Sequence, residues 1–116
     1  MSYKLTDRYP FGFKSYVANV GVKNAEDDLV VVYSTSQCSA AGVYTQHAFP
    51  GPAVDRSRQA IQSDAAQALL VVSKNANVAN GVQGDDDTHS MVQSLAKSLS
   101  LDEHLIQVAC TGVIGV

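Results

Sequence analysis

Two short apolar runs constrain the fold of this chain most. Residues 29–33 (Leu-Val-Val-Val-Tyr) and 69–73 (Leu-Leu-Val-Val-Ser) are rich in β-branched side chains, which pack well on a pleated surface. Continuous apolar runs of this length are typical of strands that are buried on both faces. The two runs therefore predict a sheet with other elements packed against it.

The remaining segments alternate between strand-like and helix-like patterns. Val54, Ser57 and Ile61 keep a three-to-four spacing that predicts a helix, and Pro52 suits the first turn of that helix. We expect strands at residues 13–22, 29–33, 40–45, 69–73 and 105–116, and helices at residues 53–66 and 85–99. The order of three strands, helix, strand, helix and strand predicts one domain of the α/β or α+β class with a layered sheet.

Three aspartates mark the expected start of the second helix. Asp85, Asp86 and Asp87 stand where carboxylates cap free N–H groups and complement the positive end of the helix dipole. Consecutive carboxylates could also hold a hard cation. However, three successive helical residues point in different directions and no spaced set of further ligands accompanies them, so capping is favoured and no metal site is expected. Farther along this helix, an apolar stripe is expected at Met91, Leu95 and Leu99.

Charge and hydropathy argue against two classes of partner. The 8 Lys and Arg residues are spread thinly and the formal net charge is −3, whereas nucleic-acid binding needs a clustered basic face. The apolar runs fall far short of the ~20 residues that span a bilayer. The first residues carry no secretory pattern, and the two cysteines, Cys38 and Cys110, lie far apart. We therefore expect free thiols, a cytoplasmic location, and neither a nucleic-acid nor a membrane partner.

Most candidate binding motifs have a plain structural explanation. The loop at residues 75–84 lacks a phosphate-binding glycine pattern, and its Asn and Gly residues are typical of a loop fixed by backbone hydrogen bonds. None of His47, His89 and His104 has the partner spacing of a zinc site. A pair of His104 with Cys110 can be imagined, but Cys110 stands in an apolar strand, where cysteines are usually inert. No cofactor or metal is expected.

One dipeptide in the last apolar segment stands out. Thr111 and Gly112 interrupt an expected strand, although glycine weakens strands and brings no side chain. A bulge or bend explains the pair most simply. Alternatively, a hydroxyl beside a glycine N–H would supply two donors to a developing oxyanion.

These residues belong to a longer pattern. Residues 110–115 (Cys-Thr-Gly-Val-Ile-Gly) resemble the signature of the ornithine acetyltransferases, also called glutamate N-acetyltransferases. Residues 12–13, 21–23, 28–29, 38–45 and 75–77 also match that family in order and spacing. The resemblance covers essentially the whole chain, and residues 49–52 and 75–78 look closer to paralogues of antibiotic-type pathways.

The resemblance implies an enzyme that moves an acetyl group from N2-acetylornithine to glutamate by a ping-pong mechanism. Family members are made as one precursor that cuts itself before a threonine, which becomes the nucleophile at the start of a second chain. Thr111 and Gly112 match the family's oxyanion hole. The implied fold is a layered sandwich of two β-sheets flanked by helices and completed by that second chain, in an α2β2 or higher assembly. The whole of residues 1–116 would then be the N-terminal part of the α chain.

The sequence departs from the family pattern in three respects. Cys110 replaces a serine, Asn80 replaces a threonine, and none of the five threonines stands in the nucleophile context. The nucleophile is therefore expected on the partner chain. Two alternatives stay open: a non-catalytic interaction subunit of the same fold, and a self-processing amidohydrolase that transfers the acyl group to water.

Overall fold

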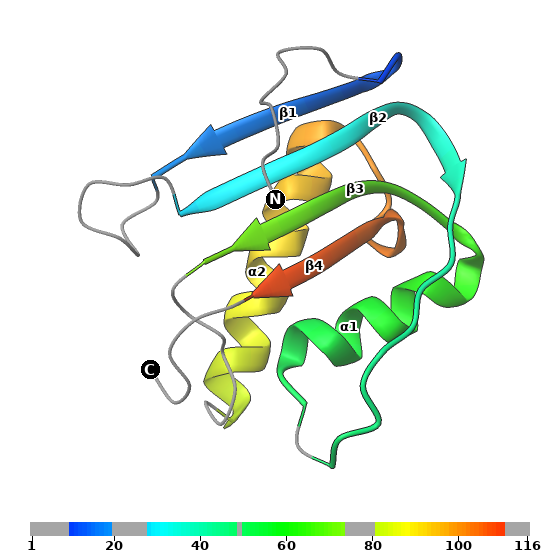
Figure 1. The fold of residues 1–116 in the computed structure, drawn as a ribbon. Coiled ribbons are helices and arrows are strands. Elements are labelled where there is room, and N and C mark those ends of the chain that lie inside the picture. The colour runs from blue at the N-terminus through cyan, green and yellow to red at the C-terminus, as the bar shows by residue number, and fades with distance from the viewer. Residues whose placement is uncertain (1–9, 20–27, 49, 74–80, 111–116) are drawn as a thin grey trace, which may run out of the picture.

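A computed structural model describes residues 10–19, 28–48, 50–73 and 81–110 (Figure 1). Within them lies a four-stranded sheet in the order β1-β2-β3-β4. The elements are β1 (Phe13–Ala18), β2 (Leu29–Ser39), α1 (Pro52–Ala60), the 3-10 turn η1 (Ile61–Ser63), β3 (Ala65–Val72), α2 (Gly81–Leu99), the 3-10 turn η2 (Glu103–Leu105) and β4 (Ile106–Cys110). The mixed α/β class predicted from the sequence is confirmed.

The sheet is antiparallel except at one edge. β1 pairs with β2 and β2 with β3 in antiparallel fashion, whereas β3 and β4 run parallel and are connected through α2. A parallel pair needs such a crossover because a tight turn cannot join its strands. In the sheet that the described residues form, β4 is the last strand, and α1 runs beside it (Figure 1).

The core lies between one face of the sheet and the two helices. Val31, Leu70, Ile106 and Val108 project from the sheet and are at most 5% exposed. Partners from the helices complete this cluster: Ala53 from α1 and Val92 and Ala96 from α2. No helix among the described residues is long and apolar enough to cross a membrane.

The opposite face of the sheet is covered by neither α1 nor α2. The register places Phe13, Val17 and Leu69 on this face, and these side chains are 41%, 51% and 40% exposed. The sequence predicted that both apolar runs are buried on both faces of the sheet. The described residues do not bury them on this second face.

The strand expected at residues 40–45 does not form. Instead, β2 continues to Ser39, and residues 40–47 lack regular secondary structure. A register shift of β2 lies between Tyr33 and Cys38, after which Cys38 pairs with Ala66. The shift allows one strand to continue through residues 34–39, which the prediction had placed between two separate strands.

The first helix is shorter than the predicted 53–66. It begins at Pro52 as expected, ends at Ala60 and is followed by η1. Asp64 then adopts a left-handed conformation with φ 58°, which aspartate tolerates better than most residues. Because this reverses the chain, residues 65 and 66 of the predicted helix lie in β3.

The second helix begins earlier than the predicted residue 85. It starts at Gly81, so Asp85 to Asp87 fall beyond its first turn and not at its start, where they were expected. Glycines near its start cost about 1 kcal/mol each relative to alanine, and packing farther along the helix outweighs that cost. The deepest stripe is Thr88, Val92 and Ala96, while the predicted Met91, Leu95 and Leu99 are only partly buried beside it. The last strand, predicted at 105–116, is β4 as far as Cys110.

Candidate active site

The two candidate oxyanion-hole residues follow β4 directly in the sequence. Thr111 and Gly112 lie outside the described residues, and so do residues 113–116 of the motif. The structure does describe the strand that leads to them, up to Cys110. The described part of the candidate site is therefore β4 and the residues that contact it.

The free edge of β4 is held by a single hydroxyl group from α1. Ser57 Oγ donates a hydrogen bond to the carbonyl oxygen of Val108 over 2.9 Å and accepts one from the Val108 N–H, also over 2.9 Å. Ser57 is only 3% exposed. The serine thus satisfies both backbone groups of Val108, which an adjacent strand would otherwise do.

Two more side chains extend this contact. Tyr44 Oη donates to Gln107 Oε1 over 2.5 Å, and Gln107 Nε2 donates to the Ser57 carbonyl oxygen over 3.2 Å. The segment that carries Tyr44 is itself tied to α1, because Arg58 donates to the Thr45 carbonyl oxygen. α1 and the segment of Tyr44 thus both contact β4 at Gln107 and Val108, which precede Thr111 by four and three residues.

The carboxyl ends of β3 and β4 lie side by side. Cys110, the last residue of β4, is in register with Val72, the last residue of β3. The chain therefore leaves both strands, before Ser73 and before Thr111, at the same end of the sheet. In α/β sheets the carboxyl ends of the strands are where ligands usually bind. Residues 74–80, which include most of the candidate Asn-rich loop, lie outside the described residues.

Cys110 is poorly suited to be a nucleophile. Its register with Val72 puts its side chain on the helix-covered face, where it packs against the core cluster. Burial raises the pKa of the Cys110 thiol, so less of the reactive thiolate is present near neutral pH. His104 lies in η2, before β4 begins, whereas Cys110 ends that strand. The two residues are therefore separated by the length of β4. Both cysteines are free, as expected.

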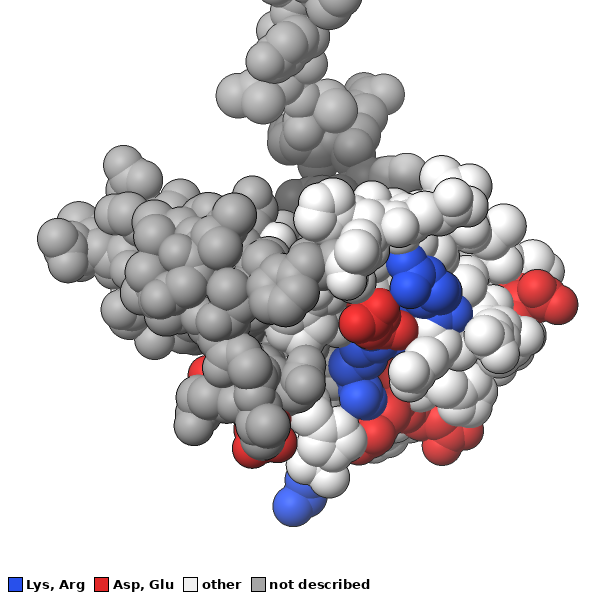
Figure 2. Space-filling model, turned by 90° about the horizontal axis from the view of Figure 1, so that it is seen from below, with Lys and Arg blue, Asp and Glu red and all other residues white. Residues whose placement is uncertain are grey.

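Three ionisable side chains join the helices to one another. Arg56 of α1 donates to His89 Nδ1 over 3.0 Å and pairs with Glu103 over 3.2 Å, which ties α1 to α2 and η2. On the face shown in Figure 2, basic and acidic side chains are intermixed rather than segregated. Among the described residues no group of three His, Cys, Asp or Glu side chains could hold a metal ion.

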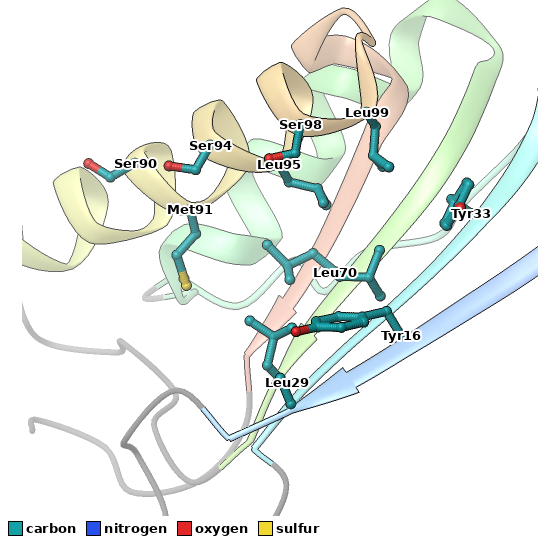
Figure 3. A pocket seen from close by; sticks show the side chains of 12 residues that line it. Tyr16, Leu29, Tyr33, Leu70, Ser90, Met91, Ser94, Leu95, Ser98 and Leu99 are labelled. Carbon is teal, nitrogen blue, oxygen red and sulfur yellow. The ribbon is translucent and has the colours of Figure 1, made fainter.

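A cavity of about 640 Å³ lies elsewhere, between α2 and the helix-covered face of β1 and β2. Met91, Leu95 and Leu99 extend from α2 toward Tyr16, Leu29 and Leu70 of the sheet (Figure 3). The lining is mostly apolar, and the serines at its rim, Ser90, Ser94 and Ser98, have no adjacent base among the lining residues. The cavity does not contain the donor pair or nucleophile–base pair that acyl transfer needs.

Sequence reasoning did not identify the residues around β4. Ser57 was placed correctly on the inner side of a helix, but its bond to β4 was not foreseen, and Tyr44 was assigned to a strand. A serine at a buried helical position is the one local signal that could have revealed the contact, because a buried hydroxyl needs a partner. Nothing local in the sequence indicates which strand supplies that partner.

Similar proteins share both the sequence and the fold. The model of the ArgJ family matches residues 14–116. The "Arginine biosynthesis bifunctional protein ArgJ 2" of Nostoc sp. is 41% identical over 106 residues, which is 91% of this chain and 27% of that protein. The "Glutamate N-acetyltransferase Oat2" of Streptomyces clavuligerus is 35% identical over 111 residues, 95% of this chain and 28% of that protein.

Two solved structures superimpose closely on the chain. One is the crystal structure of the arginine biosynthesis bifunctional protein ArgJ from Bacillus halodurans, with a TM-score of 0.86, 31% identity, and coverage of 91% of this chain and 56% of that one. The other is ornithine acetyltransferase complexed with ornithine from Mycobacterium tuberculosis, with a TM-score of 0.86 and 28% identity over 92% of this chain and 59% of that one. The chain spans just over a quarter of the length of the curated relatives named above. Since the family match covers nearly all of its residues, this chain belongs to the ArgJ family.

Proposed function

We propose that this chain is the N-terminal part of the α chain of an ornithine acetyltransferase, and that it supplies the enzyme's oxyanion hole through Thr111 and Gly112. The observation that carries the proposal is the family's Thr-Gly motif directly after β4, a strand that Ser57 binds through the backbone N–H and carbonyl of Val108. The names of the relatives, arginine biosynthesis protein and glutamate N-acetyltransferase, support the choice of reaction.

The proposed reaction has two half-reactions. A threonine at the start of the partner chain attacks the acetyl carbonyl of N2-acetylornithine, and its own α-amine takes the hydroxyl proton. The Thr111 hydroxyl and the Gly112 N–H donate to the oxyanion, and the α-ammonium gives its proton to the ornithine nitrogen, so that the C–N bond breaks and ornithine leaves as the amine. Glutamate then attacks the acyl-threonine and carries the acetyl group away, so the threonine is regenerated. Side chains and substrates supply all the groups that react, and no cofactor is required.

The partner chain would also complete the fold. The uncovered sheet face presents Phe13, Val17 and Leu69, and such a face is typically covered by a second layer. We propose that a second sheet, built partly from the partner chain of the same precursor, packs there in an α2β2 or higher assembly. The free state of both thiols is consistent with a cytoplasmic enzyme.

The test is acetyl transfer from N2-acetylornithine to glutamate by the two chains expressed together. The chain alone should be inactive, and Thr111→Ala in the assembled enzyme should lower kcat about 10²–10³-fold, the usual cost of one oxyanion donor. Thr111→Ser keeps the hydroxyl and should retain most of the rate.

Three other outcomes would point elsewhere. A full rate after Thr111→Ala would overturn the oxyanion role. An assembly without transferase or hydrolase activity would favour the interaction subunit. Release of acetate with no transfer to glutamate would favour the amidohydrolase.

A further inference from the structure

We propose that Tyr44, Ser57 and Gln107 are positioning residues for the oxyanion hole, an inference that rests on the proposed function of Thr111 and Gly112. None of the three is expected to touch the substrate. They bind β4 to α1, and so fix the position of the end of β4, which Thr111 follows.

β4 needs these contacts with α1 because of its position in the sheet. β4 has five residues, and within the described part of the chain its one neighbouring strand is β3. On its outer side the Ser57 hydroxyl is bonded to both backbone groups of Val108. Val108 precedes Thr111 by three residues, and the two residues between them, Ala109 and Cys110, belong to β4. A shift of β4 along or away from β3 would therefore move both oxyanion donors.

Tyr44 and Gln107 orient the contact between β4 and α1. The Tyr44 hydroxyl binds the Gln107 amide oxygen, and the amide nitrogen then donates to the carbonyl of Ser57. Fixing one end of the amide orients the other end, so the three groups act as a chain of hydrogen bonds. Because oxyanion stabilisation requires donors placed to within a fraction of an ångström, loosening this chain should lower the rate of the chemical step.

Tyr44→Phe is the sharpest probe, because it removes one partly exposed hydroxyl and leaves the ring. In the assembled enzyme it should lower kcat about tenfold with less than a twofold change in KM. Tyr16→Phe is the matched control and should leave kcat unchanged. Tyr16 is 59% exposed and lies on β1, the strand at the end of the sheet order opposite to β4. Gln107→Glu, which keeps an acceptor for Tyr44 but loses the donor to Ser57, should repeat the effect of Tyr44→Phe.

A double-mutant cycle separates positioning from a merely structural role. If Tyr44 acts through the oxyanion donors, Tyr44→Phe should lower kcat by a smaller factor once Thr111 is alanine, because only the Gly112 N–H then remains to be misplaced. Equal losses in both backgrounds, or a native kcat for Tyr44→Phe while Thr111→Ala is impaired, would overturn the positioning role alone. A native rate for Thr111→Ala would overturn the proposed function, and the positioning role with it.

Discussion

Ser57 Oγ lies 2.9 Å from both the nitrogen and the carbonyl oxygen of Val108, so one side-chain hydroxyl serves two backbone groups on a different element. Ser57→Ala would leave both groups of Val108 without this partner in a buried environment. An unsatisfied buried polar group costs about 1–3 kcal/mol. We therefore expect the free energy of unfolding to fall by about 2–4 kcal/mol, measured by urea denaturation.

Ser63→Ala is the control for this change. Ser63 Oγ also bonds to backbone carbonyls, those of Ala60 and Ala65, but at a partly buried turn that water can reach. Its loss should cost about 1 kcal/mol or less. If the two alanine variants lost equal stability, the edge of β4 would not depend on the serine.

The end of α2 offers a stabilising change. Ser100 follows the helix with φ 56°, and the Leu101 N–H donates back to the Ala96 carbonyl over 2.9 Å, as in a left-handed helix cap. Glycine adopts this conformation without strain, so Ser100→Gly should raise the unfolding free energy by about 0.5–1 kcal/mol. Ser98→Gly, two residues earlier and inside the helix, should lower it by about 0.5 kcal/mol. The same sign for both changes in thermal denaturation would contradict the cap.

The thiol of Cys110 should titrate at a higher pH in the folded chain than in the unfolded chain, because burial raises its pKa. The Cys38→Ser variant isolates this thiol, since the chain has only two cysteines. The rate of alkylation by iodoacetamide follows the thiolate fraction, so its inflection should lie higher in buffer than in concentrated urea. Equal inflections would show that Cys110 is not desolvated.

The same shift has a consequence for stability. An unfolded chain would lose the Cys110 proton at a lower pH than the folded chain does, so this group favours the unfolded state as pH rises through the interval between the two pKa values. The stability of the Cys38→Ser variant should therefore fall more steeply above the ordinary thiol range than that of a variant that also carries Cys110→Ala. Parallel curves would contradict the expected linkage.

Sequence patterns predicted the elements with strong local signals and missed those set by distant contacts. The run at 29–33 lies in β2 and residues 69–72 of the second run lie in β3, because β-branched side chains suit a sheet in almost any context. The length of β2 instead depends on its register with β3 beyond Tyr33, and the end of the first helical segment depends on Asp64. Ser57 and Val108 are 51 residues apart, so no local pattern could pair them. The roles of Thr111 and Gly112 stay predictions.

The uncovered sheet face should decide whether the chain binds its partner. Leu69 is 40% exposed on that face and lies outside the core cluster, so Leu69→Lys should change the unfolding free energy of the chain by less than about 1 kcal/mol. A lysine in the apolar centre of an interface leaves a charge buried without a partner, so recovery of the co-expressed chain should fall at least tenfold. Gln93→Lys, on the exposed surface of α2, adds the same charge away from this face and should not affect recovery. If both variants bound the partner chain normally, the second layer would have to pack somewhere other than on Phe13, Val17 and Leu69.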